Sequence, residues 1–242
     1  RRLAPGVDDD APDEPGRAAG RGPEQQEAPA LIRSVIFDCD GVLVDTELTS
    51  NRVLAGLLSE AGLPTTLEDC LRDHRGRAMP AVLADASRRL GGPLPFDLAG
   101  RYYATIEAIF ARSLEPVPGV VDALDRISLP NCVASSGPHH KMEVTLRTTG
   151  LWDRFAGRIF SATEVAAGKP APDLFLHAAR RMGFDPASTA VVEDSLPGVQ
   201  AAVAAGMRAF AFAGQTDAGE LARAGGEPFV DMADLPGLLA GR

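Results

Sequence analysis

Short apolar runs, rich in β-branched and aromatic residues, recur along the chain from residue 34 onward. Runs of this length and composition, bounded by polar residues, are typical of strands that are buried on both faces of a sheet. The pattern therefore predicts strands at residues 34–37, 131–134, 158–160, 190–192 and 209–212.

The segments between the later strands have the spacing of apolar residues expected for amphipathic helices. These segments are residues 120–127, 141–149, 173–182 and 196–205. Gly206 follows the last of them and is a typical residue just beyond a helix C-terminus. Strand and helix thus alternate from about residue 118, which predicts an α/β fold with a Rossmann-like parallel sheet, helices on both faces and right-handed crossovers.

The interval from residue 48 to residue 115 breaks this alternation, because it contains only helical patterns, at residues 52–61, 79–90 and 98–114. We expect an inserted α-helical cap, residues 48–115, between the two parts of the core, residues 31–47 and 116–242. The ligand site of a parallel α/β sheet lies beyond the carboxyl ends of its strands. An insertion that leaves from that edge would cover the site as a lid.

Residues 1–30 mix Pro, Gly, Ala, Asp and Glu with few aliphatic side chains. Such a segment cannot bury enough apolar surface to offset the entropy lost on ordering, so we expect a disordered tail. The chain begins with Arg1 rather than Met, which is typical of a fragment, a processed product or an alternative start.

Composition and charge narrow the function. The chain has 242 residues, of which 45% are hydrophobic, enough for a sizeable core. Its formal charge of −9 argues against nucleic acid as a partner, because binding to a phosphate backbone depends on clustered Lys and Arg. No apolar stretch approaches the roughly 20 residues that span a bilayer, and the three cysteines form no CxxC pair or even disulfide set. We expect a cytoplasmic enzyme, a monomer or weak dimer without a membrane partner.

Two acids follow the first predicted strand. Asp38 and Asp40 are two positions apart and are followed by Gly41, which lets the backbone turn sharply so that both carboxylates reach one site. Taken alone, the same pattern also fits a polar turn or part of a calcium loop.

Two further strand ends carry groups suited to phosphate. Ser135, Ser136 and Gly137 offer hydroxyls and main-chain N–H groups, although a serine here would also serve as a helix N-cap. Lys169 stands in a loop before Pro170 and is one of only two lysines, the other being Lys141. Its compact ammonium suits a phosphoryl oxygen or a carboxylate; the alternative is an ordinary surface lysine.

Glu193 and Asp194 end another apolar strand. Buried carboxylates are costly unless they are paired or bound to a metal, and Mg²⁺ would relieve the crowding. The alternative is a simple N-cap at Asp194 or Ser195 for the helix that follows.

Four short motifs follow one another along the chain: Asp38-Cys39-Asp40-Gly41, Ser135, Lys169-Pro170 and Glu193-Asp194. Their order and spacing are those of a known family. In these features residues 31–213 resemble the haloacid dehalogenase superfamily. The resemblance is to the branch with a helical cap after the first strand, which contains sugar-phosphate phosphatases and β-phosphoglucomutase.

The resemblance implies catalytic roles. Asp38 would attack phosphorus and form an aspartyl-phosphate, and Asp40 would act as general acid and then general base. Phosphoryl oxygens would be held by Ser135, Ser136 and Lys169.

The resemblance also implies a Mg²⁺ cofactor that offsets charge in the transition state. Its ligands would be Asp38, Asp40 through its carbonyl, and Asp194, with Glu193 either a further ligand or a neighbour of the ligands.

Substrate contacts are expected from the inserted segment. Arg75 and Arg77 in the loop 73–77 favour a polar, anionic substrate such as a sugar-acid phosphate, unless the loop is simply solvated. Asp45 would cap the first helix, with Glu47 in its first turn and at the substrate rim. After the second motif, His139 and His140 are expected to be exposed residues at a helix start.

These features predict a Mg²⁺-dependent phosphatase acting on a sugar, polyol or sugar-acid phosphate. The alternative is a mutase of the β-phosphoglucomutase type, whose cap histidine and arginine align at about Ser50 and Met79, neither of which can do that work, although nearby Arg75 and Arg77 could substitute. A non-catalytic binding protein would be expected to lack the nucleophile, the acid or a metal carboxylate, and all are present. In the superfamily that the chain resembles, dehalogenation and phosphonate cleavage do without an acid two residues after the nucleophile, and phosphonate cleavage also uses a lysine of the cap. The presence of Asp40 and the absence of lysine from residues 48–115 therefore disfavour both reactions.

Overall fold

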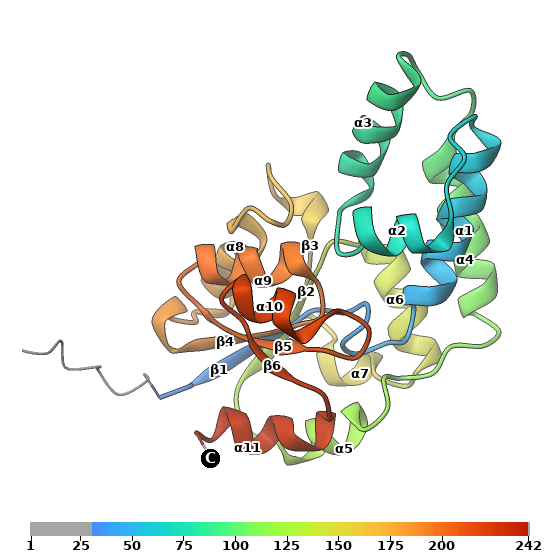
Figure 1. The fold of residues 1–242 in the computed structure, drawn as a ribbon. Coiled ribbons are helices and arrows are strands. Elements are labelled where there is room, and N and C mark those ends of the chain that lie inside the picture. Colours follow the sequence, from blue (N-terminus) through green and yellow to red (C-terminus); the bar gives the residue numbers. More distant parts are fainter. Residues whose placement is uncertain (1–30, 242) are drawn as a thin grey trace, which may run out of the picture.

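The computed structural model describes residues 31–241, so the predicted tail, residues 1–30, lies outside the described residues. Six parallel strands form one sheet in the order β3-β2-β1-β4-β5-β6 (Figure 1). The strands are β1 (Ser34–Phe37), β2 (Asn131–Ser135), β3 (Ile159–Ser161), β4 (Thr189–Glu193), β5 (Arg208–Phe212) and β6 (Glu227–Phe229).

The sheet is buried on both faces because alternate residues of each strand point to opposite sides. In β1, Val35 and Phe37 belong to one apolar cluster and Ile36 to the other. On the first side lie α5 (Val120–Arg126), α6 (His139–Thr148), α7 (Trp152–Phe155) and α11 (Leu235–Leu239), and on the second lie α8 (Asp173–Met182), α9 (Leu196–Ala204) and α10 (Ala218–Arg223). Three short 3₁₀ helices complete the core: η1 (Ala162–Glu164), η2 (Pro186–Ser188) and η3 (Met232–Asp234). The predicted Rossmann-like fold is confirmed.

The segment between β1 and α5 forms a separate group of helices beside the sheet (Figure 1). We call this group the helical insertion; it comprises α1 (Glu47–Glu60), α2 (Leu67–Asp73), α3 (Met79–Leu90) and α4 (Leu98–Phe110). Buried residues of α1 and α4, such as Leu58 and Ile106, give it an apolar interior that continues into the cluster on the α6 side of the sheet.

The two chain segments that join the insertion to the core lie side by side. Val44 forms an antiparallel bridge with Pro116, and the main-chain N–H of Asp45 donates to the carbonyl of Glu115 at 3.1 Å. The N–H of Val117 likewise donates to Leu43 at 3.1 Å. Entry and exit are therefore paired, so the chain passes between the core and the insertion through two adjacent segments.

Some predicted elements differ from those observed. Helix α1 begins at Glu47, whereas the sequence predicted a start at residue 52. The prediction missed the first turn because its residues are mostly polar and show no clear apolar stripe. Its N-cap position is Thr46, while Asp45 is exposed, so the predicted Asp45 cap is wrong and only the placement of Glu47 in the first turn is confirmed. Helix α2 was not predicted, although Thr66 and Asp69 form a capping box at its start.

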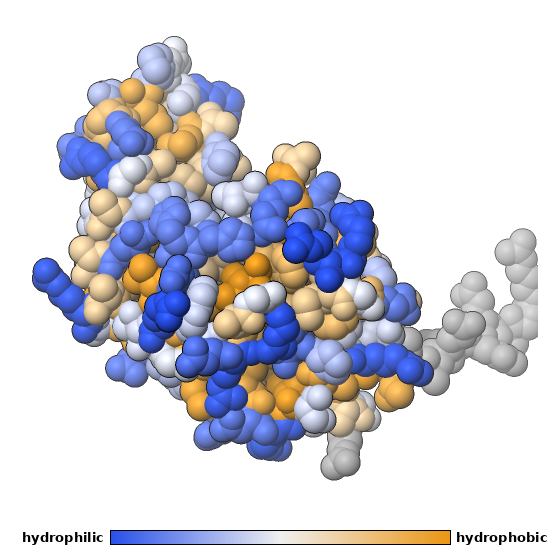
Figure 2. All heavy atoms as spheres, turned by 180° about the vertical axis from the view of Figure 1, so that it is seen from behind, coloured by the Kyte–Doolittle hydropathy of each residue, from blue (hydrophilic) through white to orange (hydrophobic). Residues whose placement is uncertain are grey.

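The surface and the cysteines of the described residues show no unusual feature. Hydrophilic and hydrophobic residues are interspersed over the face shown in Figure 2. Cys39, Cys70 and Cys132 are buried free thiols. Within residues 31–241, no helix combines the length and apolar character that a membrane span requires.

Candidate active site

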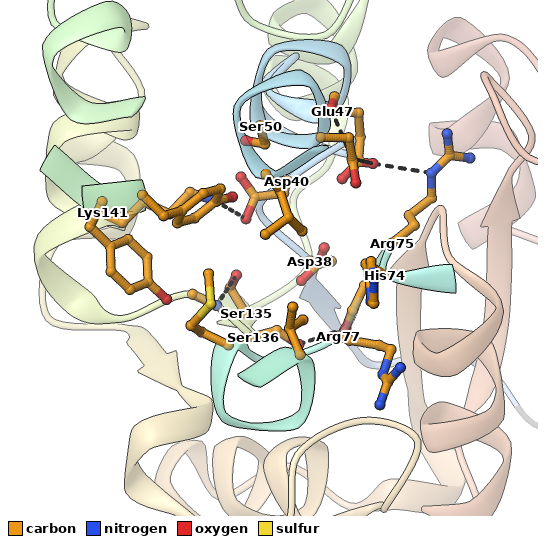
Figure 3. Close-up of a pocket in the computed structure, with 18 of the residues that line it drawn as sticks. Asp38, Asp40, Glu47, Ser50, His74, Arg75, Arg77, Ser135, Ser136 and Lys141 are labelled. Atoms are coloured by element: carbon orange, nitrogen blue, oxygen red, sulfur yellow. Dashed lines mark hydrogen bonds and ion pairs between the residues drawn. The ribbon is translucent and has the colours of Figure 1, made fainter. Parts of the chain in front are cut away.

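The ends of three neighbouring strands, β2, β1 and β4, converge on one cavity of about 80 Å³ between the core and the helical insertion (Figure 3). Asp38 follows β1, Ser135 ends β2 and Asp194 follows β4, and all three line the cavity. Strand order therefore brings together residues that are far apart in the sequence.

Lys169 anchors two of the carboxylates. Its Nζ donates to Asp38 Oδ1 and to Glu193 Oε1, each at 2.6 Å, and to the carbonyl of Ala134 at 3.3 Å. Burial acts to lower the pKa of Lys169, but the two carboxylates outweigh it and the pKa is raised, so the ammonium stays charged. The surface-lysine alternative is wrong, because the side chain is only 1% exposed.

Asp38 is the carboxylate that faces the cavity from β1. Burial raises its pKa to about 7; Lys169 opposes this shift, while Glu193 and Asp40 add to it. Lys169 occupies Oδ1, and the hydrogen bonds found among residues 31–241 leave Oδ2 unused. Asp38 thus presents one oxygen to the cavity while the other is fixed.

Asp38, Glu193 and Asp194 each place a carboxylate oxygen within 4.8 Å of the others. Burial raises the pKa of Asp194 well above its usual value, and the charges of Glu47, Glu193 and Asp38 add to the effect. Gly41 permits this crowding, because a Cβ there would lie 2.2 Å from Asp194 Oδ2. A cluster of hard oxygen donors that repel one another fits a divalent cation such as Mg²⁺.

Glu193 differs from the other two acids because both of its oxygens are occupied. Oε1 accepts from Lys169, and Oε2 accepts from the N–H groups of Asp194 and Ser195 at 2.9 Å and from Ser195 Oγ at 2.8 Å. A Cβ at Gly198 would lie 1.8 Å from this carboxyl group. Ser195 is also the N-cap of α9, so that expectation is confirmed alongside the acidic cluster.

Asp40 is held by two donors. Lys141 Nζ donates to Oδ2 (Figure 3). Thr46 Oγ1 donates to Oδ1, and both distances are 2.6 Å. Burial acts to raise the pKa of Asp40, but Lys141 and Thr46 outweigh it and the pKa is lowered. Sequence reasoning gave neither donor a role, although the scarcity of lysine was a signal for Lys141.

The serines after β2 have different contacts. Ser135 is 1% exposed, lines the cavity and accepts from the N–H of Gly137 at 3.1 Å. Ser136 Oγ donates to the carbonyl of Gly76 in the helical insertion at 2.9 Å. Neither serine caps α6, whose N-cap position is Pro138, so the N-cap alternative is wrong. His139 and His140 are exposed at the start of α6, as expected.

The loop between α2 and α3 closes the cavity from the side of the insertion. A Cβ at Gly76 would lie 2.3 Å from Ser195 Oγ, so this loop is pressed against the core and the solvated-loop alternative is wrong. Ser50 and Met79, the positions aligned with the mutase histidine and arginine, also line the cavity.

The two arginines of this loop have different surroundings. Arg75 Nε pairs with Glu47 Oε2 at 3.0 Å, and both side chains are less than a tenth exposed. Arg75 also donates to Thr216, whose hydroxyl donates to the carbonyl of Asp194 at 2.6 Å. Thr216 was not found from the sequence, because no motif marks the loop after β5.

Arg77 carries a charge without a carboxylate partner among residues 31–241. Within the described part of the chain, its guanidinium donates only to the main-chain carbonyls of Asp73 and Ala81, at 3.2 and 3.4 Å. Nearby, His74 Nδ1 and Ser50 Oγ are buried, and among residues 31–241 His74 Nδ1 has no hydrogen-bond partner, while Ser50 Oγ has at most a weak contact with the Tyr102 side chain. The cavity is therefore lined by polar groups with unused hydrogen-bonding capacity.

The parallel α/β fold and the cluster of Asp38, Lys169 and Asp194 at its strand ends are the features expected of a haloacid dehalogenase-like hydrolase. Comparison with known sequences points to the same class. The sequence profile of the haloacid dehalogenase-like hydrolases matches residues 32–206, and the chain belongs to this family. The predicted family is confirmed.

Two curated proteins and one solved structure are similar to this chain over most of its length. The chain is 29% identical over 212 residues to 6-phosphogluconate phosphatase of Escherichia coli (strain K12), covering 87% of this chain and 96% of that one. It is 30% identical to hexitol phosphatase B of the same organism, covering 74% and 83%. A haloacid dehalogenase-like structure from Agrobacterium tumefaciens is 35% identical with a TM-score of 0.73, covering 87% and 98%.

Proposed function

We propose that the chain is a Mg²⁺-dependent phosphatase that hydrolyses a small phosphate ester through an aspartyl-phosphate on Asp38. The observation that carries the proposal is the geometry of Asp38: its Oδ1 is fixed by Lys169 at 2.6 Å and its side chain faces the cavity. The similarity to proteins named as phosphatases supports it.

In the first half of the reaction, Oδ2 of Asp38 attacks phosphorus, and the bond from phosphorus to the leaving oxygen breaks. Ser135 would hold one phosphoryl oxygen, and Lys169 would hold another by exchanging its 3.3 Å contact with the Ala134 carbonyl for it. Asp40 would take up a proton before the transfer, although Lys141 and Thr46 favour its ionised form, and would pass that proton to the leaving oxygen. In the second half, Asp40 takes a proton from the water that attacks the aspartyl-phosphate, which releases phosphate and restores Asp38.

Mg²⁺ would be held by Asp38, Asp194 and the carbonyl of Asp40, and when bound it offsets negative charge on the transferring phosphoryl group. Glu193 would stand beside these ligands, because its oxygens already bind Lys169 and the start of α9. Its role is then to orient the lysine and the strand end that carries Asp194.

The helical insertion would act as a cap, residues 48–115, that opens to admit substrate. The cavity of about 80 Å³ is roomy enough for a few waters, so a sugar phosphate enters only when the cap moves away. Contacts such as Ser136 with Gly76 would form on closure and exclude bulk water during transfer.

The substrate class we propose is a phosphorylated sugar, polyol or sugar acid. Arg77 offers a positive charge, and His74 and Ser50 offer unpaired polar atoms for hydroxyl groups. The names of the two curated relatives fall in the same class. Hydrolysis is favoured over the mutase reaction because the motif alignment places the mutase histidine and arginine at about Ser50 and Met79, which line the cavity and cannot replace them. Cytoplasmic location and oligomeric state stay predictions.

The test is a screen of phosphate release from sugar, polyol, sugar-acid and nucleotide monophosphates, with Mg²⁺ and with a chelator. We expect Mg²⁺-dependent hydrolysis of at least one of the first three groups. A coupled assay would reveal conversion of β-glucose 1-phosphate to glucose 6-phosphate, and a rate above that of phosphate release would overturn the assignment.

A further inference from the structure

Lys141 is a buried cation for which the mechanism above has no use. It lies in the first turn of α6, its side chain is 7% exposed, and its Nζ is 2.6 Å from Asp40 Oδ2. The pair joins residues 101 positions apart in the sequence. Removing such a group from water is costly, so its presence calls for an explanation.

The local structure makes room for this contact. A Cβ at Gly137 would lie 3.3 Å from Lys141 Cδ and 3.8 Å from Asp40 Oδ2, so the glycine leaves the path of the lysine side chain free. Thr46 reaches the other oxygen of Asp40 from the N-terminus of α1. Asp40 is thus held by one donor from the core and one from the connection to the insertion.

The two lysines of the chain therefore have parallel positions. Lys169 binds one oxygen of Asp38, and Lys141 binds one oxygen of Asp40. A chain that uses arginine for its other cationic side chains apart from histidine keeps lysine at these two sites. A compact ammonium on a flexible stem fits a closed cavity where a planar guanidinium would need a wider space.

Building on the proposed function, we propose that Lys141 is a positioning residue that fixes the carboxylate of Asp40 for proton transfer with the leaving group. Donors on both oxygens restrict rotation of the carboxylate, and each oxygen keeps a further lone pair that can carry the transferred proton. The Lys141 charge lowers the pKa of Asp40, so loss of Lys141 reduces proton donation only where the loss of orientation outweighs the rise in that pKa. Without Lys141, the same carboxylate loses one of its two anchors, and Thr46 alone holds it.

This role predicts a dependence on the leaving group. An alkoxide, the leaving group of a sugar or polyol phosphate, needs a proton, whereas p-nitrophenolate leaves without one. General acid catalysis contributes about 10²- to 10⁴-fold. Lys141→Met should therefore lower kcat/KM for the best alkyl phosphate by about 10²-fold, and that for p-nitrophenyl phosphate by less than about 10-fold.

A double-mutant cycle separates this role from a structural one. In the Asp40→Asn background, Lys141→Met should have almost no further effect on kcat/KM for the alkyl phosphate, because the group it positions is already gone. The Asp40→Asn/Lys141→Met protein also removes both buried charges and so should fold even if Lys141→Met alone does not. Glu143→Gln, an exposed change on the same helix, is the control.

The outcomes are distinct. Equal losses on both substrates, effects that add in the double variant, or an unchanged Lys141→Met enzyme would each overturn the positioning role while phosphatase activity stands. Absence of phosphate release from the unmodified protein would instead overturn the proposed function. Selective loss on alkyl phosphates together with a non-additive cycle is the result we expect.

Discussion

Lys169 neutralises part of the negative charge of the acidic cluster, because its ammonium group forms ion pairs with both Asp38 and Glu193. Removing one partner of a buried ion pair costs about 3 to 5 kcal/mol, since it leaves uncompensated charge. Lys169→Met should therefore abolish measurable phosphate release and lower the free energy of unfolding by about 3 kcal/mol in urea titrations. Retained activity at normal stability would contradict this account.

Arg77 and Arg75 should respond differently to truncation, although they are two residues apart. Arg77→Ala is expected to raise KM for a sugar-acid phosphate by about 10-fold and to leave a polyol phosphate nearly unaffected, because it removes an unpaired charge near the substrate. Arg75→Ala should instead lower stability, since it leaves Glu47 buried without its partner. Steady-state kinetics on both substrates, with thermal unfolding, separates the two; equal KM changes for both substrates would refute the assignment to Arg77.

At the scale of elements, the loop between α2 and α3 is one of the places where the insertion contacts the core. Gly76 has φ of +72°, and an added Cβ would lie 2.3 Å from Ser195 Oγ. Gly76→Ala should therefore hold the insertion away from the core and lower kcat/KM about 10²-fold.

Gly91 provides a matched control, because it has the same φ of +72° but open space around the added Cβ. Both substitutions bring similar backbone strain, of about 1 kcal/mol, whereas only Gly76→Ala should reduce activity. If Gly91→Ala lost as much activity as Gly76→Ala, strain rather than loop contact would be the cause.

The elements that the sequence predicted well are those with strong local patterns. The bounds of β1, α3 and α8 were predicted correctly, because their apolar positions are regular and their ends are marked. Helix α2 has seven residues and only one buried side chain, so periodicity could not reveal it. Strand β6 has three residues and includes Pro228, a residue rare in strands, and it is visible only through its pairing with β5.

The residues of the candidate site also fall into those that local sequence motifs predicted and those that they did not. Asp38, Lys169 and Asp194 were found because each follows a recognisable strand or loop motif. Lys141 and Thr46 were missed because their contacts with Asp40 depend on how α6 and the start of α1 sit against the sheet. No local pattern encodes a contact across 101 positions.

For the whole molecule, we expect the acidic cluster to link stability to pH and, through the proposed Mg²⁺ site, to the cation. Burial raises the pKa of Asp38 to about 7 from a usual value of 3.8, and that of Asp194 is raised too. A carboxyl group with a raised pKa in the folded state stabilises the fold below pH 4 and loses that contribution as pH rises through its folded pKa. Metal-free protein should therefore lose this contribution between about pH 4 and 7.

Mg²⁺ should reverse this loss because it binds the ionised carboxylates. We expect Mg²⁺ to raise Tm more at about pH 8 than at about pH 5.5, relative to protein in chelator. In Asp38→Asn the difference between the two pH values should shrink. Equal shifts of Tm at both pH values in the unmodified protein would show that these carboxylates do not bind the cation.

In the proposed reaction, Asp38 carries the phosphoryl group between the two half-reactions. Acid quenching during turnover, followed by proteolysis and mass spectrometry, tests it directly. We expect a peptide containing Asp38 that is heavier by one phosphoryl group, and we expect both this peptide and phosphate release to be absent in the Asp38→Asn protein. Undiminished turnover by Asp38→Asn, or a phosphoryl group found on another residue, would contradict it.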